Sequence, residues 1–305
     1  MEGLRQSLHS HGYVRIPPEI FQLDPVTIQE LRNEFDRLFH GHYETGIYPD
    51  EIHWRPALSK DNVTRELCNA WKASNVIAKI VCGEKLGQLA SSLMGWSVVR
   101  IGQDDVLHKP PLSNAVGFHQ DGAYISDNFV PSHDNCLTMW IALDDADQEN
   151  GALQYAPGSH HWPYQAVGTV AESSFHFLHN ENEKSPLSSE NVHMEPLKNA
   201  AVRAGKDHEE VIHLVETVAV PAGQMVVHHQ NLWHGSGPNI STTRSRRALV
   251  AHLIDGEVVW RTDPPPHYIY GRYYIRGESI LRDDFFPIVY SQVTGIKRTE
   301  WLPKL

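Results

Sequence analysis

The first hundred residues place their hydrophobic side chains with the period of an α-helix. Over residues 25–40 the apolar positions lie three or four residues apart, mainly at Ile28, Leu31, Phe35, Leu38 and Phe39. Asp24 and Pro25, at the start of this stripe, are typical of a helix N-terminus. Residues 61–81 and 84–94 carry similar stripes. The pattern predicts a mainly helical part over residues 1–96.

From residue 97 onward, short runs of β-branched and aliphatic residues replace the helical period. The clearest runs are 97–101, 137–143, 215–220, 224–228 and 247–254. Turn-forming residues separate several of them, as at Pro157-Gly158 and over residues 235–239. Many short strands with such turns are typical of a sandwich or a barrel. We expect a mostly β core over residues 97–262, flanked by helices, within a single domain that spans residues 1–305.

Two segments depart from the strand pattern. Residues 162–210 are polar and rich in His, Asn, Glu and Ser, which is typical of an insertion that forms a lid or is disordered. Residues 263–305 form an aromatic C-terminal extension that is too apolar for a free tail. We expect this extension to pack on the body of the protein or on a partner subunit, which is compatible with a homodimer.

Composition narrows the class of protein. The chain has 305 residues, and its hydrophobic content of 41% is enough for a sizeable core. The net charge of −11 argues against nucleic acid or an anionic membrane as a partner. No run of apolar residues approaches the roughly 18 that a membrane span needs. Three cysteines without a close pair are typical of a reducing compartment, so we expect a cytoplasmic protein.

His119, Asp121 and the distant His234 form the most informative pattern in the chain. Two imidazoles and one carboxylate are the ligand set that holds non-haem Fe(II) and leaves positions open for a cosubstrate and O₂. His119 and Asp121 are two residues apart, so on a strand their side chains would leave the same face. Oxygen chemistry also needs electrons that side chains do not readily supply, so a cosubstrate is expected.

The residues after His234 suggest which cosubstrate this is. Ser236 follows two residues later, and three arginines, Arg244, Arg246 and Arg247, follow further on. An arginine binds a planar carboxylate through two parallel hydrogen bonds. A 2-oxo acid would therefore chelate iron with one end while its far carboxylate meets an arginine and Ser236.

Several short motifs follow one another over roughly residues 10–275. They are Lys109-Pro110-Pro111, His119-Gln120-Asp121, residues 140–144, residues 149–153, residues 157–160 and residues 234–239. In this order they resemble the phytanoyl-CoA dioxygenase family of Fe(II)- and 2-oxoglutarate-dependent oxygenases. Each motif is short, but the ordered series is specific. The resemblance implies a double-stranded β-helix, the jelly roll of cupin-like proteins, flanked by helices.

The resemblance also implies roles for individual residues. The iron ligands would be His119, Asp121 and His234, and the contacts to 2-oxoglutarate would include Trp140, Ser236 and Lys109.

The arginine that would anchor 2-oxoglutarate is assigned less directly. The family's spacing from the distal histidine falls on Ser245, which cannot bind a carboxylate. Arg246 is the best match to the family's arginine, and Arg244 is the alternative. If the strand alternates regularly, Arg247 would point away from both.

Three further residues are candidates for contacts with the substrate. Gln120 would alternate to the face opposite the ligands, Tyr124 would line a substrate mouth, and Trp233 would belong to the core or to the pocket. Of the neighbouring pair His228 and His229, one could face the site behind the ligands, although a packed or exposed histidine is the favoured interpretation.

Together these expectations indicate an Fe(II)- and 2-oxoglutarate-dependent dioxygenase. It would consume O₂, release succinate and CO₂, and oxidise a C–H bond of a small molecule, with hydroxylation as the default because Asp121 supplies a carboxylate where halogenating relatives have a small residue. A specialised metabolite is the favoured substrate. The alternatives are an acyl-CoA hydroxylase, a cupin-like metal enzyme that does not use 2-oxoglutarate, and a non-catalytic binding protein.

Overall fold

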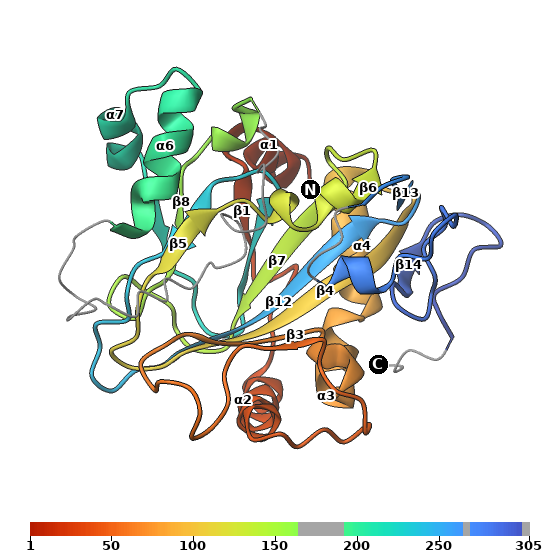
Figure 1. The fold of residues 1–305 in the computed structure, drawn as a ribbon, viewed down its shortest axis with the longest axis horizontal. Coiled ribbons are helices and arrows are strands. Elements are labelled where there is room, and N and C mark those ends of the chain that lie inside the picture. The colour runs from red at the N-terminus through yellow and green to blue at the C-terminus, as the bar shows by residue number, and fades with distance from the viewer. Residues whose placement is uncertain (164–191, 265–268, 301–305) are drawn as a thin grey trace.

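The computed structural model describes residues 1–163, 192–264 and 269–300, and its centre is a pair of β-sheets (Figure 1). Within these ranges the α-helices are α1 (Glu2–His11), α2 (Pro25–Phe39), α3 (Asn75–Val81), α4 (Glu84–Met94), α6 (Glu195–Arg203) and α7 (His208–His213). Short 3₁₀ helices are η1 (Ala70–Lys72), η2 (Asp121–Ala123), η3 (Ser126–Asn128), η4 (Ser159–His161), η5 (Val192–Met194) and η6 (Tyr270–Arg272). The strands are β1 (Tyr13–Ile16), β2 (Glu51–Ile52), β3 (Arg65–Cys68), β4 (Val98–Lys109), β5 (Val116–His119), β6 (Phe129–Val130), β7 (Cys136–Ala142), β8 (Leu153–Tyr155), β9 (Glu216–Val218), β10 (Met225–His229), β11 (His234–Ser236), β12 (Arg246–Asp255), β13 (Val259–Trp260) and β14 (Ile288–Ser291).

The chain passes back and forth between the two main sheets. The larger sheet has the order β1-β10-β7-β12-β4-β3-β2, with β14 also paired to β4. The smaller sheet has the order β5-β11-β8-β9. From β4 onward the strands β4, β7, β10 and β12 lie in the larger sheet, while β5, β8 and β11, which come between them, lie in the smaller one. This alternation is the path of a jelly roll.

Both faces of the larger sheet are covered, so alternate residues of one strand enter different cores. On β12, Leu249 and Ala251 pack with the apolar faces of α2, α3 and α4, whereas Ala248 and Val250 pack with residues of the smaller sheet. This explains why the segment 247–254 is almost continuously apolar instead of alternating with polar residues.

Two of the predicted helices form as expected. Helix α2 begins at Pro25, and the Asp24 carboxylate accepts hydrogen bonds from the backbone N–H groups of Val26 and Thr27, at 2.9 and 3.0 Å. These bonds satisfy donors that the first turn of a helix leaves without partners. Helix α4 covers Glu84–Met94, the predicted segment.

The prediction of a helix over residues 61–81 was largely wrong. Only Asn75–Val81 is α-helical, while residues 65–68 form β3 and pair with β4. A strand offers backbone donors and acceptors along its edge, and pairing with them overrides a weak local preference for helix. Together with β1 and β2, this strand means that the first 96 residues supply part of the larger sheet as well as helices.

The two segments outside the strand pattern also acquire structure. Residues 195–203 and 208–213 of the polar segment are helices α6 and α7, which Figure 1 shows beside β5 and β8. The expected lid spans residues 162–210, and its residues 164–191 lie outside the described part of the chain. The aromatic extension packs on the body, because Tyr270 and Phe286 are buried and β14 pairs with β4. Among the described helices, none has the length and apolar character that crossing a membrane requires.

Candidate active site between the sheets

His119, Asp121 and His234 meet between the two sheets. His119 ends β5 and His234 begins β11, and the antiparallel pairing of these strands places the two residues directly opposite each other. Asp121 begins η2, and its Oδ1 lies 3.6 Å from His119 Nε2 and 3.5 Å from His234 Nε2. One ligand atom from each residue lies within 4.8 Å of the others, as binding to a single metal ion requires.

The backbone orients both imidazoles. Nδ1 of His119 lies 2.8 Å from the carbonyl oxygen of Gly117, and Nδ1 of His234 lies 2.9 Å from that of Leu232. A carbonyl only accepts, so each Nδ1 carries the proton and each Nε2 keeps its lone pair for a metal. Burial lowers the pKa of His119 to about 3 and that of His234 to about 4, so both rings are neutral near pH 7.

The Asp121 carboxylate has a different set of partners on each oxygen. Oδ2 accepts the Thr138 hydroxyl at 2.5 Å and His228 Nε2 at 3.0 Å, while Oδ1 faces the two imidazoles. Burial alone would raise the pKa of Asp121, but His234 and the hydrogen bond from His228 outweigh burial and hold the pKa well below its usual range. The carboxylate is therefore ionised and presents one oxygen to the cluster.

Behind Thr138 lies a buried chain of polar groups. His252 donates through Nδ1 to the Thr138 hydroxyl at 2.9 Å and through Nε2 to Asp105 Oδ2 at 2.8 Å. Burial would lower the pKa of His252, but its hydrogen bond to Asp105 outweighs burial and raises that pKa well above 6.5. Gln103 Nε2 completes the set with a 2.8 Å bond to the other Asp105 oxygen.

The structure distinguishes between the neighbouring histidines of β10. His228 faces the site and bonds to Asp121, and its Nδ1 lies 3.0 Å from the Tyr155 hydroxyl. His229 bonds to Asp134 instead. The sequence did not single out Thr138, which lies two residues before Trp140 on β7. A strict alternation along β7 would have placed both side chains on the inward face.

Arg246, Lys109 and Ser236 form a basic group beside the cluster. Lys109 Nζ donates to Ser236 Oγ at 2.9 Å, and Arg246 Nη2 lies 3.4 Å from the same oxygen. Arg246 Cζ lies 5.3 Å from the centre of the Trp140 ring. Burial lowers the pKa of Arg246 to about 10, which leaves it cationic at neutral pH.

This basic group fits a carboxylate. Arg246 Nη1 and Trp140 Nε1 are buried and have no hydrogen-bond partner within the part of the chain that the structure describes. Buried donors of this kind normally have an acceptor, so their presence indicates that a ligand satisfies them. Two N–H donors beside the Lys109 amine suit a carboxylate oxygen pair.

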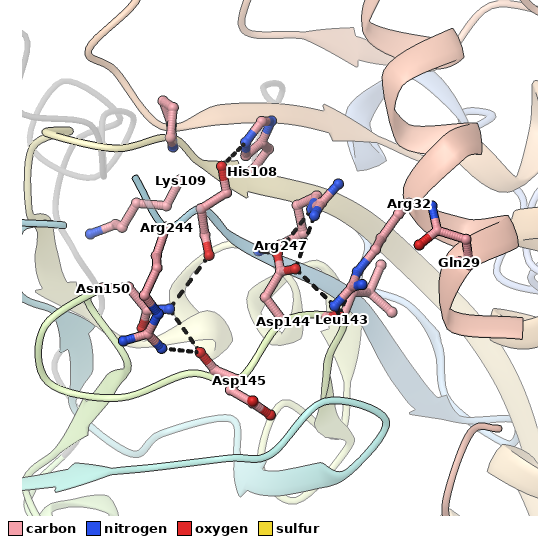
Figure 2. Close-up of polar contacts among 12 residues, drawn as sticks. Gln29, Arg32, His108, Lys109, Leu143, Asp144, Asp145, Asn150, Arg244 and Arg247 are labelled. Atoms are coloured by element: carbon pink, nitrogen blue, oxygen red, sulfur yellow. Dashed lines mark hydrogen bonds and ion pairs between the residues drawn. The ribbon is translucent and has the colours of Figure 1, made fainter. Parts of the chain in front are cut away.

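The other two arginines are engaged in ion pairs. Figure 2 shows Arg247 turned toward Asp144, to which its Nε and Nη2 donate at 2.9 Å each. Arg244 forms ion pairs with Asp147 at 2.7 Å and Glu149 at 2.9 Å. Arg246 is therefore the arginine whose guanidinium reaches the cavity, whereas Arg244 lies before β12 and is not on the inward face that the alternation expected.

The cluster lines one cavity together with Arg246 and Ser236 of the basic group. Its walls contain His119, Asp121, His234, Ser236, Arg246, Trp140, Thr138, His228, His252, Tyr124, Ile125, Thr64, Glu66, Gln103, Asp105, Leu107, Val116, Leu153, Gly235 and Val250. Glu66, Gln103 and Asp105 were not expected from the sequence, because β3 was predicted as helix and the predicted strand beginning at residue 97 ended at 101 instead of 109.

The three expected substrate contacts fall in different places. Tyr124 lines the cavity, with its ring centre 6.4 Å from that of His119. Gln120 is not among the residues that line the cavity, and its Nε2 donates to the carbonyl oxygen of Asn231. Trp233 packs in the apolar cluster that contains Phe118, outside the residues that line the cavity.

Comparisons with known proteins agree with this geometry. The family model for phytanoyl-CoA dioxygenase matches residues 8–248. The ectoine dioxygenase of Nocardia farcinica (strain IFM 10152) is 26% identical over 282 residues, covering 84% of this chain and 90% of that protein. A probable alpha-ketoglutarate-dependent hypophosphite dioxygenase of Stutzerimonas stutzeri is 28% identical over 179 residues, covering 58% of this chain and 53% of that protein. The match thus spans about half the length of the second relative.

A solved structure supports the fold. The non-haem alpha ketoglutarate-dependent epimerase SnoN of nogalamycin biosynthesis matches with a TM-score of 0.64 at 21% identity, covering 95% of this chain and 98% of that one. This similarity confirms the predicted double-stranded β-helix with flanking helices. The family model covers most of the residues, and it includes all three members of the His/Asp/His cluster. The chain belongs to the phytanoyl-CoA dioxygenase family.

Proposed function

We propose that this protein is a 2-oxoglutarate-dependent non-haem iron dioxygenase in which His119, Asp121 and His234 hold Fe(II). The observation that carries the proposal is the combination of this cluster and the buried Arg246 on the walls of one cavity. Two neutral imidazoles and one carboxylate are a ligand set that would suit Fe(II). The family membership and the relatives named for alpha-ketoglutarate support the same activity.

For 2-oxoglutarate we propose four contacts. Arg246 would bind the carboxylate far from the metal through Nη1 and Nη2, and Ser236 would donate its hydroxyl to the same group. Burial and the charge of Arg246 lower the pKa of Lys109 well below its usual range, so Lys109 would contribute as an N–H donor, and Trp140 Nε1 supplies a further donor. A dicarboxylic 2-oxo acid is favoured over a monocarboxylate because a buried guanidinium left unpaired would be costly.

The bound iron and cosubstrate would couple decarboxylation of 2-oxoglutarate to succinate and CO₂ with oxidation of a substrate C–H bond by O₂. The chain's own residues orient the reactants and limit water. Leu107, Val116, Ile125 and Leu153 line the cavity with apolar surface, which favours a dry site around the cluster. Thr138 and His228 fix Asp121, so the orientation of its free oxygen is set before a metal binds.

We infer that the substrate is a small molecule, because the His/Asp/His cluster lies in a cavity with mostly apolar walls, as ligand sites for small molecules do. The substrates in the relatives' names, ectoine and hypophosphite, differ widely in chemistry, so neither is transferred to this chain. A cytoplasmic location and a homodimer stay predictions.

The proposal is tested by anaerobic titration of the protein with Fe(II) and 2-oxoglutarate, following the weak visible charge-transfer band of the chelate. We expect the band in the wild type and its loss in His119→Ala and Asp121→Ala. An iron-binding wild type that develops no band and has no affinity for 2-oxoglutarate would contradict the cosubstrate assignment. That result would favour a cupin-like metal enzyme that oxidises its substrate without 2-oxoglutarate.

A further inference from the structure

Glu66 is a buried carboxylate on the wall of the cavity. It lies on β3, next to β4 in the larger sheet, and it is only 7% exposed. The pairing of Glu66 with Leu107 places it beside another residue that lines the cavity. Thr64, two residues earlier, lines the same wall.

The other carboxylates of the cavity wall, Asp105 and Asp121, already have partners. Asp105 is bound by His252 and Gln103, at 2.8 Å each. Asp121 belongs to the proposed iron site. Glu66 also lies near His53. The Nε2 atom of His53 is 3.7 Å from Glu66 Oε2, which is beyond hydrogen-bond distance.

The cations of the neighbourhood are directed elsewhere. Arg65, next to Glu66 in sequence, places its guanidinium 3.9 Å from the centre of the Trp54 ring. Arg246 and Lys109 share Ser236 in the basic group. Burial and the neighbouring Asp105 raise the pKa of Glu66 well above its usual range, so without a cation beside it the carboxyl favours its protonated form. A cationic ligand at this point would favour the carboxylate and supply the partner that a buried charge needs.

We propose that Glu66 recognises the substrate, and that the substrate is an organic ammonium compound with an apolar body. Its protonated nitrogen would donate to the Glu66 carboxylate. Its carbon skeleton would contact Val116 and Ile125, which line the cavity together with His119. Such binding would hold C–H bonds beside the His/Asp/His cluster. This inference rests on the proposed function, whose substrate class it specifies.

A metal ion is the rival occupant of Glu66. His53, Glu66 and Cys68 each offer one ligand atom within 4.8 Å of the others. Two observations favour the ammonium compound. Glu66 lines the cavity but His53 and Cys68 do not. Cys68 is fully buried in the apolar cluster that contains Ile125 and Phe129, which disfavours a charged thiolate there.

The test uses pairs of compounds that differ only in an amine or a hydroxyl: benzylamine and benzyl alcohol, cyclohexylamine and cyclohexanol, tryptamine and tryptophol. Each is titrated anaerobically into the Fe(II)- and 2-oxoglutarate-loaded protein, and the shift of the charge-transfer band gives an apparent Kd. We expect amines to bind roughly tenfold or more tightly than their partners, because the hydrogen bond involves two charged groups. Glu66→Gln should abolish the preference, and the exposed Glu257→Gln should keep it.

Several results would overturn the inference: amines and alcohols binding alike, a preference that survives Glu66→Gln, or no amine in the set shifting the band. The unperturbed band of Glu66→Gln reports an intact iron site, and absence of the band in the wild type contradicts the proposed function itself. Co(II) added to His119→Ala tests the rival. The rival predicts a thiolate-to-cobalt absorption in His119→Ala. If this absorption is lost both when Cys68→Ser is added to His119→Ala and when Glu66→Gln is added to it, Glu66 binds a metal and the proposal is overturned.

Discussion

Asp121 presents its two carboxylate oxygens to different partners. Thr138 and His228 hold one oxygen by hydrogen bonds, while the other faces His119 and His234. At the scale of single residues, the proposed iron site thus depends on groups that would not touch the metal. Such partners fix a ligand's orientation, and their loss typically lowers metal affinity.

Replacing Thr138 tests this support. Thr138→Val keeps the shape of the side chain but removes the hydroxyl that donates to Asp121, so we expect Fe(II) affinity to fall by roughly 10- to 100-fold. Anaerobic Fe(II) titration measures the change, and the exposed Thr217→Val on β9 is the control. Equal affinities in the two variants would show that Asp121 keeps its orientation without this bond.

Arg246 and Arg244 are separated by one residue but have different surroundings. Arg246 is buried beside Ser236, whereas Arg244 is paired with Asp147 and Glu149 at the surface. We expect Arg246→Gln to weaken 2-oxoglutarate binding by roughly 100-fold, because a buried charge pair is lost. Arg244→Gln should change it little. Binding is measured by the anaerobic band titration, and the reverse order of effects would move the anchor to Arg244.

At the scale of elements, strand β12 serves two layers. Its inward residues Arg246, Val250 and His252 line the cavity, and its outward residue Leu249 packs under the helices. The same alternation on β7 directs Trp140 inward and Met139 outward. Substitutions on the outward face of such a strand should therefore affect the stability of the protein, whereas substitutions on the inward face should affect the site.

Leu249→Ala tests this division. Leu249 is fully buried in the core shared with α2, α3 and α4, so we expect the free energy of unfolding to fall by about 2–5 kcal/mol. The affinity for 2-oxoglutarate should stay near wild type, because Leu249 faces away from the cavity. Chemical denaturation and band titration measure the two quantities, with the partly exposed Val259→Ala as the control. If Leu249→Ala loses affinity for 2-oxoglutarate while its free energy of unfolding equals that of the wild type, the two faces of β12 do not have these separate roles.

At the scale of the whole molecule, the buried histidines link folding to pH. The pKa of His119 is lowered by burial from 6.5 to about 3, and that of His234 to about 4. Between these values and 6.5 the unfolded chain binds protons that the folded chain does not. Stability without metal therefore rises with pH through this window and is lost as the pH falls.

Each such histidine contributes a slope of up to about 1.4 kcal/mol per pH unit to the free energy of unfolding. We expect His119→Ala and His234→Ala each to make the dependence of this free energy on pH shallower between about pH 4 and 6. Urea denaturation of the metal-free proteins over this range measures the slope. Parallel curves for wild type and variants would mean that these histidines are not held neutral by burial.

The sequence alone was enough to predict the strand-rich core and to single out the three residues of the His/Asp/His cluster that the fold brings together. His119 and Asp121 are close in the chain, and the ordered motifs carry a specific resemblance. Strong local signals, such as Asp24 and Pro25 before a helical stripe, also determined where α2 begins.

Only the tertiary structure decided which other side chains enter the cavity. Residues 65–68 became a strand because the edge of β4 was available for pairing, and this brought Glu66 inward. Thr138, Asp105 and His252 come from three different strands, and no short-range pattern relates them. Which arginine reaches the cavity likewise depended on contacts distant in sequence, because acidic residues pair with Arg244 and Arg247 and leave Arg246 on the cavity wall. Long-range pairing and burial set these contacts, so local sequence preference could not reveal them.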